Sequence, residues 1–169
     1  MKVTLMMALT VDGKIGKDTA HFPDWTEQAD KTLFVKITKE AGAIIMGSKT
    51  FDTLKKPLPG RKHIVLTRNK NRRSDWKEVV FTQEPPRDIL LSLESEGYTA
   101  AVIAGGAQIN QLFAEEHLID EIIVTYSPKI FGAGLSLFSN AIDMELTLIE
   151  SHPIGQNTLY ARYGVETIK

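Results

Sequence analysis

The sequence predicts an α/β fold in which a mainly parallel sheet lies between two layers of helices, a three-layer sandwich. Two observations support this prediction. Short segments rich in Val, Ile, Leu and Thr alternate with helical patterns as far as residue 126, which favours right-handed crossovers between parallel strands. The last two such segments are joined around Ile154–Asn157, an arrangement typical of an antiparallel hairpin added at a sheet edge.

Eight segments are predicted strands, each bounded by Gly, Pro, Asn or Asp. They are Val3–Leu9, Ala43–Met46, Lys62–Thr67, Glu78–Phe81, Ala100–Ala104, Glu121–Tyr126, Glu145–His152 and Thr158–Val165. No repeat, low-complexity tract or linker interrupts them, so residues 1–169 are expected to form a single domain.

Four helices are expected between the strands. They run from a cap at Thr26 or Asp24 to about Glu40, over Ser48–Leu54, from Pro86 to near Gly97, and over Ala107–Glu116. In the first, Leu33, Phe34 and Ile37 recur at helical spacing. The third opens on a proline, which is favoured in the first turn of a helix.

The composition excludes several functional classes. Twenty basic and twenty-one acidic residues give a net charge of −1, which argues against a general nucleic-acid or membrane-surface binder. Without cysteine there is no disulfide, thiol nucleophile or Cys-based zinc site, and the four histidines are not at metal-ligand spacing, so no metal is expected. No segment has the layout of a membrane span or signal peptide. We therefore expect a cytoplasmic monomer or homodimer.

Asp30 is the most informative single residue. On a helical wheel it lies between Leu33, Phe34 and Ile37, on the face that should be buried. Because aspartate is seldom buried without a partner, Asp30 is a candidate for a carboxylate that binds a cationic or hydrogen-bonding ligand. The alternatives are a helix edge open to solvent or a buried salt bridge. Glu27, one turn earlier, competes for the ligand-binding role.

Two strand-to-helix turns carry glycine where a ligand could approach. In Met46–Thr50, Gly47 precedes a helix whose N-terminal N–H groups can bind a phosphate, although a Gly–Ser turn also serves as a plain cap. In Ile103–Gln108, Gly105 and Gly106 let the backbone come close to a flat or charged ligand, or form a tight turn. Neither turn is a GxGxxG fingerprint, so an ordinary Rossmann domain is not indicated.

Three further loops carry candidate ligand contacts. Thr67 and Arg68 end a predicted strand, and a hydroxyl beside a guanidinium suits the 2′-phosphate that distinguishes NADPH from NADH. The basic run 69–73 that follows is more simply a solvated loop. Residues 12–16 form either a lid over a site or a plain turn. Arg61, in the proline-rich turn before the third strand, is well placed to bind a ligand carboxylate.

These pieces in this order resemble the dihydrofolate reductase superfamily, which comprises dihydrofolate reductase and the pyrimidine reductases of riboflavin synthesis. The most specific elements are Ile45–Phe51 (IMGSKTF) and Pro57–Arg68 (PLPGRKHIVLTR), and the resemblance covers nearly the whole chain. It implies NADPH-dependent hydride transfer to a small-molecule substrate. It also implies an eight-stranded sheet flanked by four helices.

The resemblance implies roles for residues on the substrate side. Trp25 and Asp30 keep the family's five-residue spacing of tryptophan and acidic residue, and Thr125 matches the threonine that supports the carboxylate. Arg61 matches the arginine that grips the α-carboxylate of the folate glutamate. The resemblance thus implies that Asp30, Trp25 and Thr125 are the catalytic residues. The substrate-binding residues are Ala8, Phe34 and Arg61, with Glu27 as the competing carboxylate.

On the cofactor side the resemblance implies a larger set. It comprises Ile15, Gly16, Gly47, Ser48, Lys49, Thr50, Leu66, Thr67, Arg68, Ala104, Gly105, Gly106, Ala107, Gln108 and Ile109. Ile15 and Gly16 belong to a mobile loop that covers the nicotinamide, with a lid over residues 12–24. Ser48 stands where many dihydrofolate reductases have a basic residue, for which Lys49 or Arg68 would compensate.

Three functions stay open at this point. Asp30 and Arg61 together favour dihydrofolate as the substrate. Residues 12–15, 105–110 and 119–128 look more like the pyrimidine reductase branch, whose substrate is a ribosylaminopyrimidine. A nucleotide-binding module without catalysis is the third alternative. That alternative does not explain why an aspartate, Asp30, lies on an apolar helix face.

Overall fold

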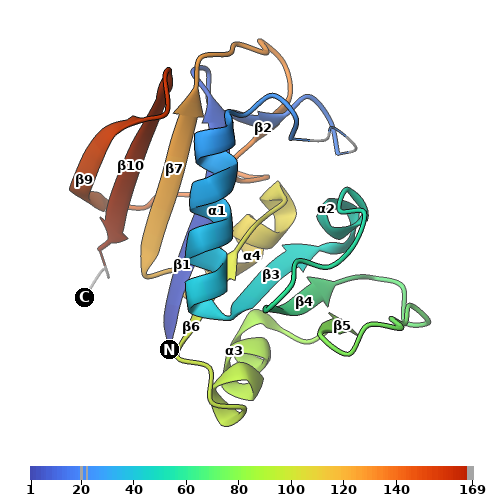
Figure 1. Cartoon of the computed structure of the whole chain (residues 1–169). Helices are drawn as coiled ribbons and strands as arrows, with labels where there is room; N and C mark the ends of the chain where they lie inside the picture. Colours follow the sequence, from blue (N-terminus) through green and yellow to red (C-terminus); the bar gives the residue numbers. More distant parts are fainter. Residues whose placement is uncertain (20, 22, 167–169) are drawn as a thin grey trace.

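Six parallel strands and a C-terminal antiparallel hairpin form one eight-stranded sheet in a computed structural model that describes residues 1–19, 21 and 23–166 (Figure 1). The strand order is β5-β4-β3-β6-β1-β7-β10-β9. The strands are β1 (Lys2–Thr10), β3 (Ala43–Gly47), β4 (Lys62–Leu66), β5 (Val79–Thr82), β6 (Ala100–Ile103), β7 (Glu121–Ser127), β9 (Leu146–Ile154) and β10 (Thr158–Val165). The mainly parallel sheet with an edge hairpin is therefore confirmed, and the eight predicted strands all form.

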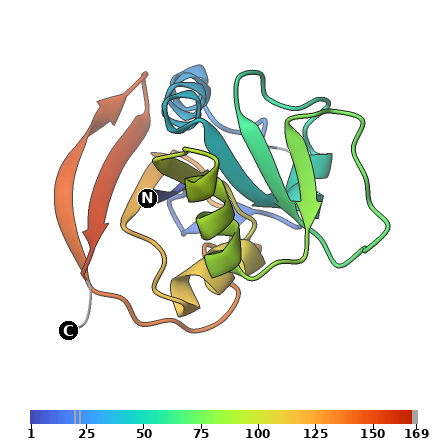
Figure 2. The same cartoon turned by 90° about the horizontal axis from the view of Figure 1, so that it is seen from below.

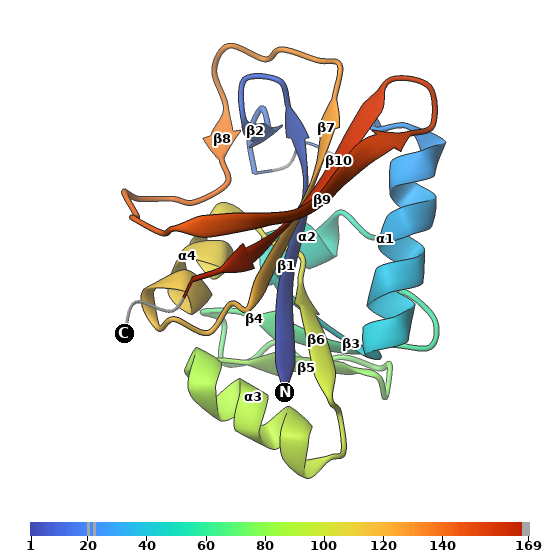
Figure 3. The same ribbon diagram turned by 90° about the vertical axis from the view of Figure 1, so that its left-hand side faces the viewer.

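Four helices flank the sheet in the described part of the chain, as predicted. They are α1 (Gln28–Ala41), α2 (Ser48–Asp52), α3 (Pro86–Ser95) and α4 (Ala107–Glu115). Figures 2 and 3 show α1 on one face of the sheet and α3 and α4 on the other. The last three helices end one or two residues earlier than the sequence predicts, a difference common at frayed helix ends. None of the helices in the described part of the chain is long and apolar enough to cross a membrane.

The two faces of the sheet carry separate apolar cores because successive strand residues point to opposite sides. On β1, Leu5 belongs to the cluster that includes Phe113 of α4. Its neighbour Met6 belongs to the cluster that packs against Leu33 and Ile37 of α1. Both β1 residues are almost fully buried, so the sheet is packed against helices on both faces.

The start of α1 differs from the sequence prediction. Neither Thr26 nor Asp24 caps the helix; its N-cap is Glu27, whose side chain makes no capping bond. The Glu27 carboxylate instead accepts hydrogen bonds from the backbone N–H groups of Gln156 and Asn157 in the turn between β9 and β10. The cap prediction was wrong because a contact 130 residues away along the chain uses this side chain, and no local pattern announces it.

A small second sheet, which the sequence analysis missed, lies in the upper part of the molecule as drawn in Figure 3. β2 (Lys14–Gly16) pairs antiparallel with β8 (Leu135–Ser136). A Cβ added to Gly134 would lie 2.4 Å from the carbonyl oxygen of Gly16, so the two backbones are in close contact. The lid expected over residues 12–24 is thus tied to the segment after β7. Residues 20 and 22 of that expected lid lie outside the described residues.

Candidate active site

A buried carboxylate on α1 is bound to the central part of the sheet. Asp30 is 7% exposed, and its Oδ1 accepts a hydrogen bond of 2.5 Å from Oγ1 of Thr125, which is fully buried on β7. The register between β1 and β7 places Ala8 beside Thr125. The helical wheel is confirmed in placing Asp30 on the buried face, and its partner is a hydroxyl rather than a cation.

The same face of α1 holds a guanidinium at its other end. Phe34 and Thr38 follow Asp30 at intervals of four residues, so all three lie along one side of the helix. Arg61, 5% exposed, donates from Nη1 to Thr38 Oγ1 (2.8 Å) and from Nε to the carbonyl oxygen of Pro59 (3.2 Å). Asp30 and Thr38 are eight residues apart, about 12 Å along the helix axis.

Arg61 is a deeply buried cation. Burial lowers the pKa of Arg61 from its usual value, and within the described ranges no acidic group forms an ion pair with it. A buried charge is costly when unpaired. This arrangement therefore suits an anionic ligand that completes the hydrogen bonding of the guanidinium.

Trp25 and the lid segment pack on the loop after β7. The indole of Trp25 meets the ring of Phe131 edge to face, with centroids 5.2 Å apart, and His21 meets the same ring at 5.4 Å. The Trp25 Nε1 atom is buried and has no hydrogen-bond partner among the residues that the structure describes. An indole N–H can only donate, so this group is available to a bound acceptor.

Asp12, in the turn between β1 and β2, is hydrogen-bonded to the loop after β7. Its carboxylate accepts hydrogen bonds from the backbone N–H groups of Phe131 (3.2 Å) and Gly132 (2.7 Å), and from Oγ1 of Thr10 (2.5 Å). The Thr10 hydroxyl, followed by the backbone donors, holds the pKa of Asp12 below its usual range despite some desolvation. The sequence left residues 12–16 between a lid and a plain turn. The contacts made by Asp12 join this segment to the loop after β7, and the lid stays a prediction.

Glu27 lies apart from the Asp30 group in its contacts. Desolvation raises the pKa of Glu27, but the hydrogen bonds from the backbone of Asn157 and Gln156 outweigh it and lower the pKa overall. Its carboxylate oxygens thus hold the hairpin turn against the start of α1. Glu27 therefore binds the backbone of the hairpin turn, whereas Asp30 is the carboxylate on the buried face of α1.

The two glycine turns meet at the carboxyl ends of β3 and β6. The N–H of Gly47 donates to the carbonyl oxygen of Gly105 over 2.8 Å. A Cβ on Gly105, whose φ is +86°, would lie 2.9 Å from Cε of Met7, and a Cβ on Gly47 would lie 3.1 Å from Cγ1 of Ile109. Neither Gly47 nor Gly106, the caps of α2 and α4, has a side chain to bind the first amides of its helix. Backbone N–H groups of α4 are therefore open to a ligand.

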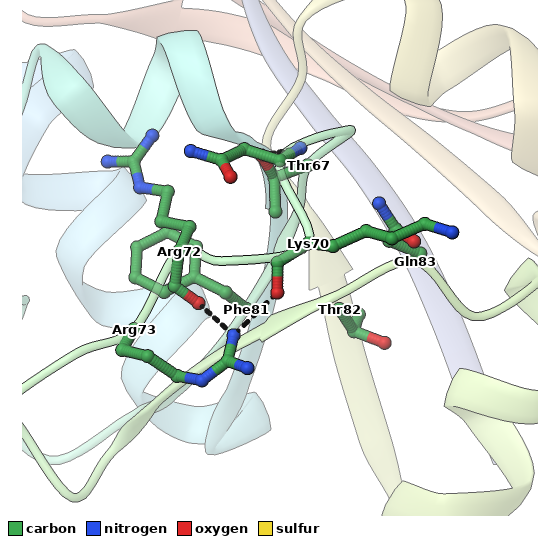
Figure 4. Close-up of a pocket in the computed structure, with 8 residues that line it drawn as sticks. Thr67, Lys70, Arg72, Arg73, Phe81, Thr82 and Gln83 are labelled. Carbon is green, nitrogen blue, oxygen red and sulfur yellow. Dashed lines mark hydrogen bonds between the residues drawn. The ribbon is translucent and has the colours of Figure 1, made fainter.

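A cavity of about 360 Å³ lies beyond these turns, at the ends of β4 and β5 (Figure 4). It is lined by Thr67, Asn69, Lys70, Arg72, Arg73, Phe81, Thr82 and Gln83. Of the predicted cofactor residues, only Thr67 lines this cavity, and Leu66 directly precedes Thr67 in the chain. Arg68 is exposed, and its carbonyl oxygen accepts a hydrogen bond from the Gln83 side chain. Asp30 and Arg61 do not line this cavity, so the candidate site has two separate parts.

Sequence reasoning missed most of the side chains around this cavity. It assigned residues 69–73 to a solvated loop, whereas Lys70 and Arg73 border the cavity while keeping exposed side chains. Arg72 is held differently: it forms an ion pair with Asp52 and stacks 4.3 Å from the ring of Phe81. The basic composition was the available signal, but only the fold brings the run beside the end of β5.

The remaining predicted cofactor residues lie at the same end of the sheet. Ile15 and Gly16 are in β2, Ser48, Lys49 and Thr50 form the first part of α2, Ala104 follows β6, and Ala107, Gln108 and Ile109 begin α4. Carboxyl ends of parallel strands are where ligands bind in open α/β sheets. The fold therefore places these residues at the end of the sheet where its parallel strands finish.

Comparison with known proteins gives one consistent relationship. The model of the dihydrofolate reductase family matches residues 2–159. The chain is 33% identical to dihydrofolate reductase type 3 of Salmonella typhimurium over 95% of its own length and 94% of that protein. RibD of Acinetobacter baumannii has a similar fold (TM-score 0.82, 17% identity, 98% of this chain and 58% of that one). So does dihydrofolate reductase of Enterococcus faecalis, solved with NADP(H) (TM-score 0.75, 22% identity, 98% and 97%). The chain therefore belongs to the dihydrofolate reductase family, a family of oxidoreductases.

Proposed function

We propose that this protein reduces 7,8-dihydrofolate to tetrahydrofolate with NADPH. The reaction adds a hydride to C6 of the pterin and a proton to N5, and the hydride is what NADPH supplies when it is bound. The residues of this chain have three tasks: they bind the pterin ring, bind the acidic tail of the substrate, and hold the cofactor with water excluded. Rate then comes mainly from alignment and electrostatics.

The proposal rests on the two anchors along α1. Asp30 offers a carboxylate near the start of the helix, and Arg61 is bound to Thr38 near its end, about 12 Å further along the helix axis. Dihydrofolate has hydrogen-bond donors on its pterin ring at one end and glutamate carboxylates at the other. The Asp30 carboxylate on α1 and the Arg61 guanidinium bound to the same face of that helix match these two ends in chemistry and in order.

Asp30 binds the 2-amino group and N3 of the pterin through charge-assisted hydrogen bonds. Its negative charge favours the protonated, electrophilic ring, and the hydrogen bond from Thr125 keeps the carboxylate oriented. Trp25 offers its unpartnered Nε1–H to the substrate or to a bridging water. Ala8 and Phe34 supply apolar contact on either side of this group.

The chain fits NADPH at the glycine turns and at the basic cavity. The open backbone N–H groups at the start of α4 and the close approach of Gly47 to Gly105 suit a pyrophosphate. Thr67 and Arg68, with Lys70 and Arg73 nearby, suit a 2′-phosphate. The lid around β2 then covers the nicotinamide and excludes water.

A pyrimidine reductase that uses NADPH is the second candidate, supported by the fold shared with RibD. Its ribose 5-phosphate substrate calls for basic groups, and it offers no use for Asp30 beside them. Following NADPH absorbance with dihydrofolate and, separately, with the ribosylaminopyrimidine would distinguish the two substrates. Turnover of dihydrofolate alone is the expected result. Turnover of the pyrimidine alone would replace this proposal, and NADPH binding without turnover of either would favour a non-catalytic module.

A further inference from the structure

His63 is a fully buried histidine whose two ring nitrogens both bind backbone groups of one turn. Its Nδ1 lies 3.0 Å from the carbonyl oxygen of Arg61, and its Nε2 lies 3.1 Å from the backbone nitrogen of Leu58. A carbonyl can only accept and an amide N–H can only donate. The ring is therefore the neutral tautomer that carries its proton on Nδ1.

The turn that His63 binds is the one that carries Arg61. It includes Gly60, whose φ of +74° is the left-handed conformation that glycine adopts without strain. Both ends of the turn are tied to the imidazole, at Leu58 and at Arg61 itself. Between these two ends, Pro59 and Gly60 are exposed to solvent, and the Pro59 carbonyl oxygen accepts a hydrogen bond from Arg61 Nε.

The imidazole is kept neutral and in place by its surroundings. Burial, first of all, lowers the pKa of His63; the nearby Arg61 cation lowers it further, while the hydrogen bond to the Arg61 carbonyl and the charge of Glu78 raise it. The ring of Phe51 on α2 packs against it edge to face, with centroids 6.1 Å apart. A neutral ring is what the two observed hydrogen bonds require.

We propose that His63 is a positioning residue that fixes the turn Leu58–Arg61 so that the Arg61 guanidinium is held ready for the tail carboxylate of the substrate. This inference rests on the proposed function, because it assigns a substrate group to Arg61. A guanidinium binds a carboxylate through two parallel N–H···O bonds, a geometry that small displacements of the turn disrupt. His63 acts through Arg61 and does not itself reach the substrate.

A merely structural histidine predicts a different outcome from a positioning one. Loss of general packing would affect every substrate alike, because it would act on stability. Loss of positioning would affect substrates that have the glutamate carboxylate and spare those that lack it. Dihydrofolate and dihydropteroate differ in the glutamate, so the pair separates the two roles.

The test measures KM and kcat for both substrates in three variants of His63. His63→Phe keeps a planar ring and removes both hydrogen bonds. His63→Asn places a carboxamide near the position of Nδ1, and His63→Gln places one near the position of Nε2, so each retains one bond and keeps the test usable if the Phe variant fails to fold. His117→Asn, at an exposed histidine with φ of +54°, is the matched control.

We expect His63→Phe to raise KM for dihydrofolate about tenfold, with kcat and the KM for dihydropteroate nearly unchanged, and we expect smaller increases for the Asn and Gln variants. A double-mutant cycle sharpens the test, because residues that act through one another are not additive. In an Arg61→Ala background, His63→Phe should raise KM no further.

Equal increases for both substrates, or a full additional increase in the Arg61→Ala background, would overturn the positioning role while leaving the proposed function in place. Wild-type KM values in all folded His63 variants would do the same. Failure of the wild type to turn over dihydrofolate would instead remove the proposed function, and with it this inference.

Discussion

Thr125 Oγ1 donates a hydrogen bond of 2.5 Å to Asp30 Oδ1, joining a central strand to the first helix through two buried polar side chains. The bond occupies one site on one carboxylate oxygen. An ionised carboxylate has about four lone-pair sites, so Asp30 keeps acceptors for a ligand. This relationship gives Asp30 a defined orientation without neutralising its charge.

Asp30→Asn should leave the fold intact and lower kcat for dihydrofolate at neutral pH by at least a hundredfold, about the contribution of a positioned acid or base. The amide matches the carboxylate in shape but cannot favour a protonated pterin. Steady-state kinetics and a thermal melt measure the two properties. Glu27→Gln is the comparison: an active Asp30→Asn enzyme beside an inactive Glu27→Gln enzyme would show that Glu27 is the functional carboxylate.

Arg61→Ala should raise KM for dihydrofolate roughly ten- to a hundredfold, corresponding to about 1.5–3 kcal/mol for a charged hydrogen bond. The tail is remote from the reacting ring, so this contact is the same in ground and transition states and kcat should barely change. Dihydropteroate should be handled alike by the wild type and the variant. Unchanged dihydrofolate kinetics would make Arg61 a loop residue and favour the pyrimidine substrate.

Arg68→Ala should weaken NADPH binding about tenfold or more while leaving NADH binding unchanged, because only NADPH has a 2′-phosphate. Cofactor titration by fluorescence gives both dissociation constants. Arg87→Ala is a matched control, since Arg87 is an exposed arginine on α3, away from the cavity. Equal use of both cofactors by the wild type, unchanged in Arg68→Ala, would contradict the assignment of Thr67 and Arg68.

Asp12→Ala should loosen the lid and lower kcat severalfold, because the Asp12 carboxylate accepts hydrogen bonds from two backbone N–H groups of the loop after β7. Hydrogen exchange should quicken at Phe131 and Gly132 and stay the same at the buried amide of Ile103 on β6. Faster exchange throughout the molecule would show that Asp12 contributes to global stability rather than to the local contact between the lid and the loop after β7.

The stability of the fold should depend on pH through His63. Its folded pKa is depressed, mainly by burial, below the unfolded value of about 6.5. The unfolded state therefore binds more protons between these two pKa values, so this contribution is full above about pH 6.5 and is lost as pH falls below it, by at most about 1.4 kcal/mol per pH unit. Arg61 and Glu78 are the charged groups that act on the ring.

Urea denaturation of the wild type and His63→Asn between pH 7.5 and 5.5 tests this dependence. The wild type should lose free energy of unfolding more steeply than the variant, because the variant has no group that titrates at this position. Parallel curves for the two proteins would show that His63 does not contribute.

The arrangement of strands and helices was predictable because local patterns carry it. The apolar runs of β1, β3, β4, β6 and β7 are bounded by turn residues, and their alternation with helices implies parallel pairing. The position of Asp30 on the buried face followed from helical spacing alone. The glycine turns after β3 and β6 were visible as motifs, and strand ends in such a sheet converge at one edge.

What the sequence by itself determined is therefore the order of elements, the buried carboxylate and the glycine turns, all of which depend on residues close together in the chain. Only the tertiary structure decided what each side chain contacts. Glu27 binds a turn 130 residues away, and β2 pairs with β8. Arg61 donates a hydrogen bond to Thr38, and His63 binds the turn that carries Arg61. These contacts join distant segments whose spacing contains no periodic signal, so they form only once the packed sheet brings the segments together.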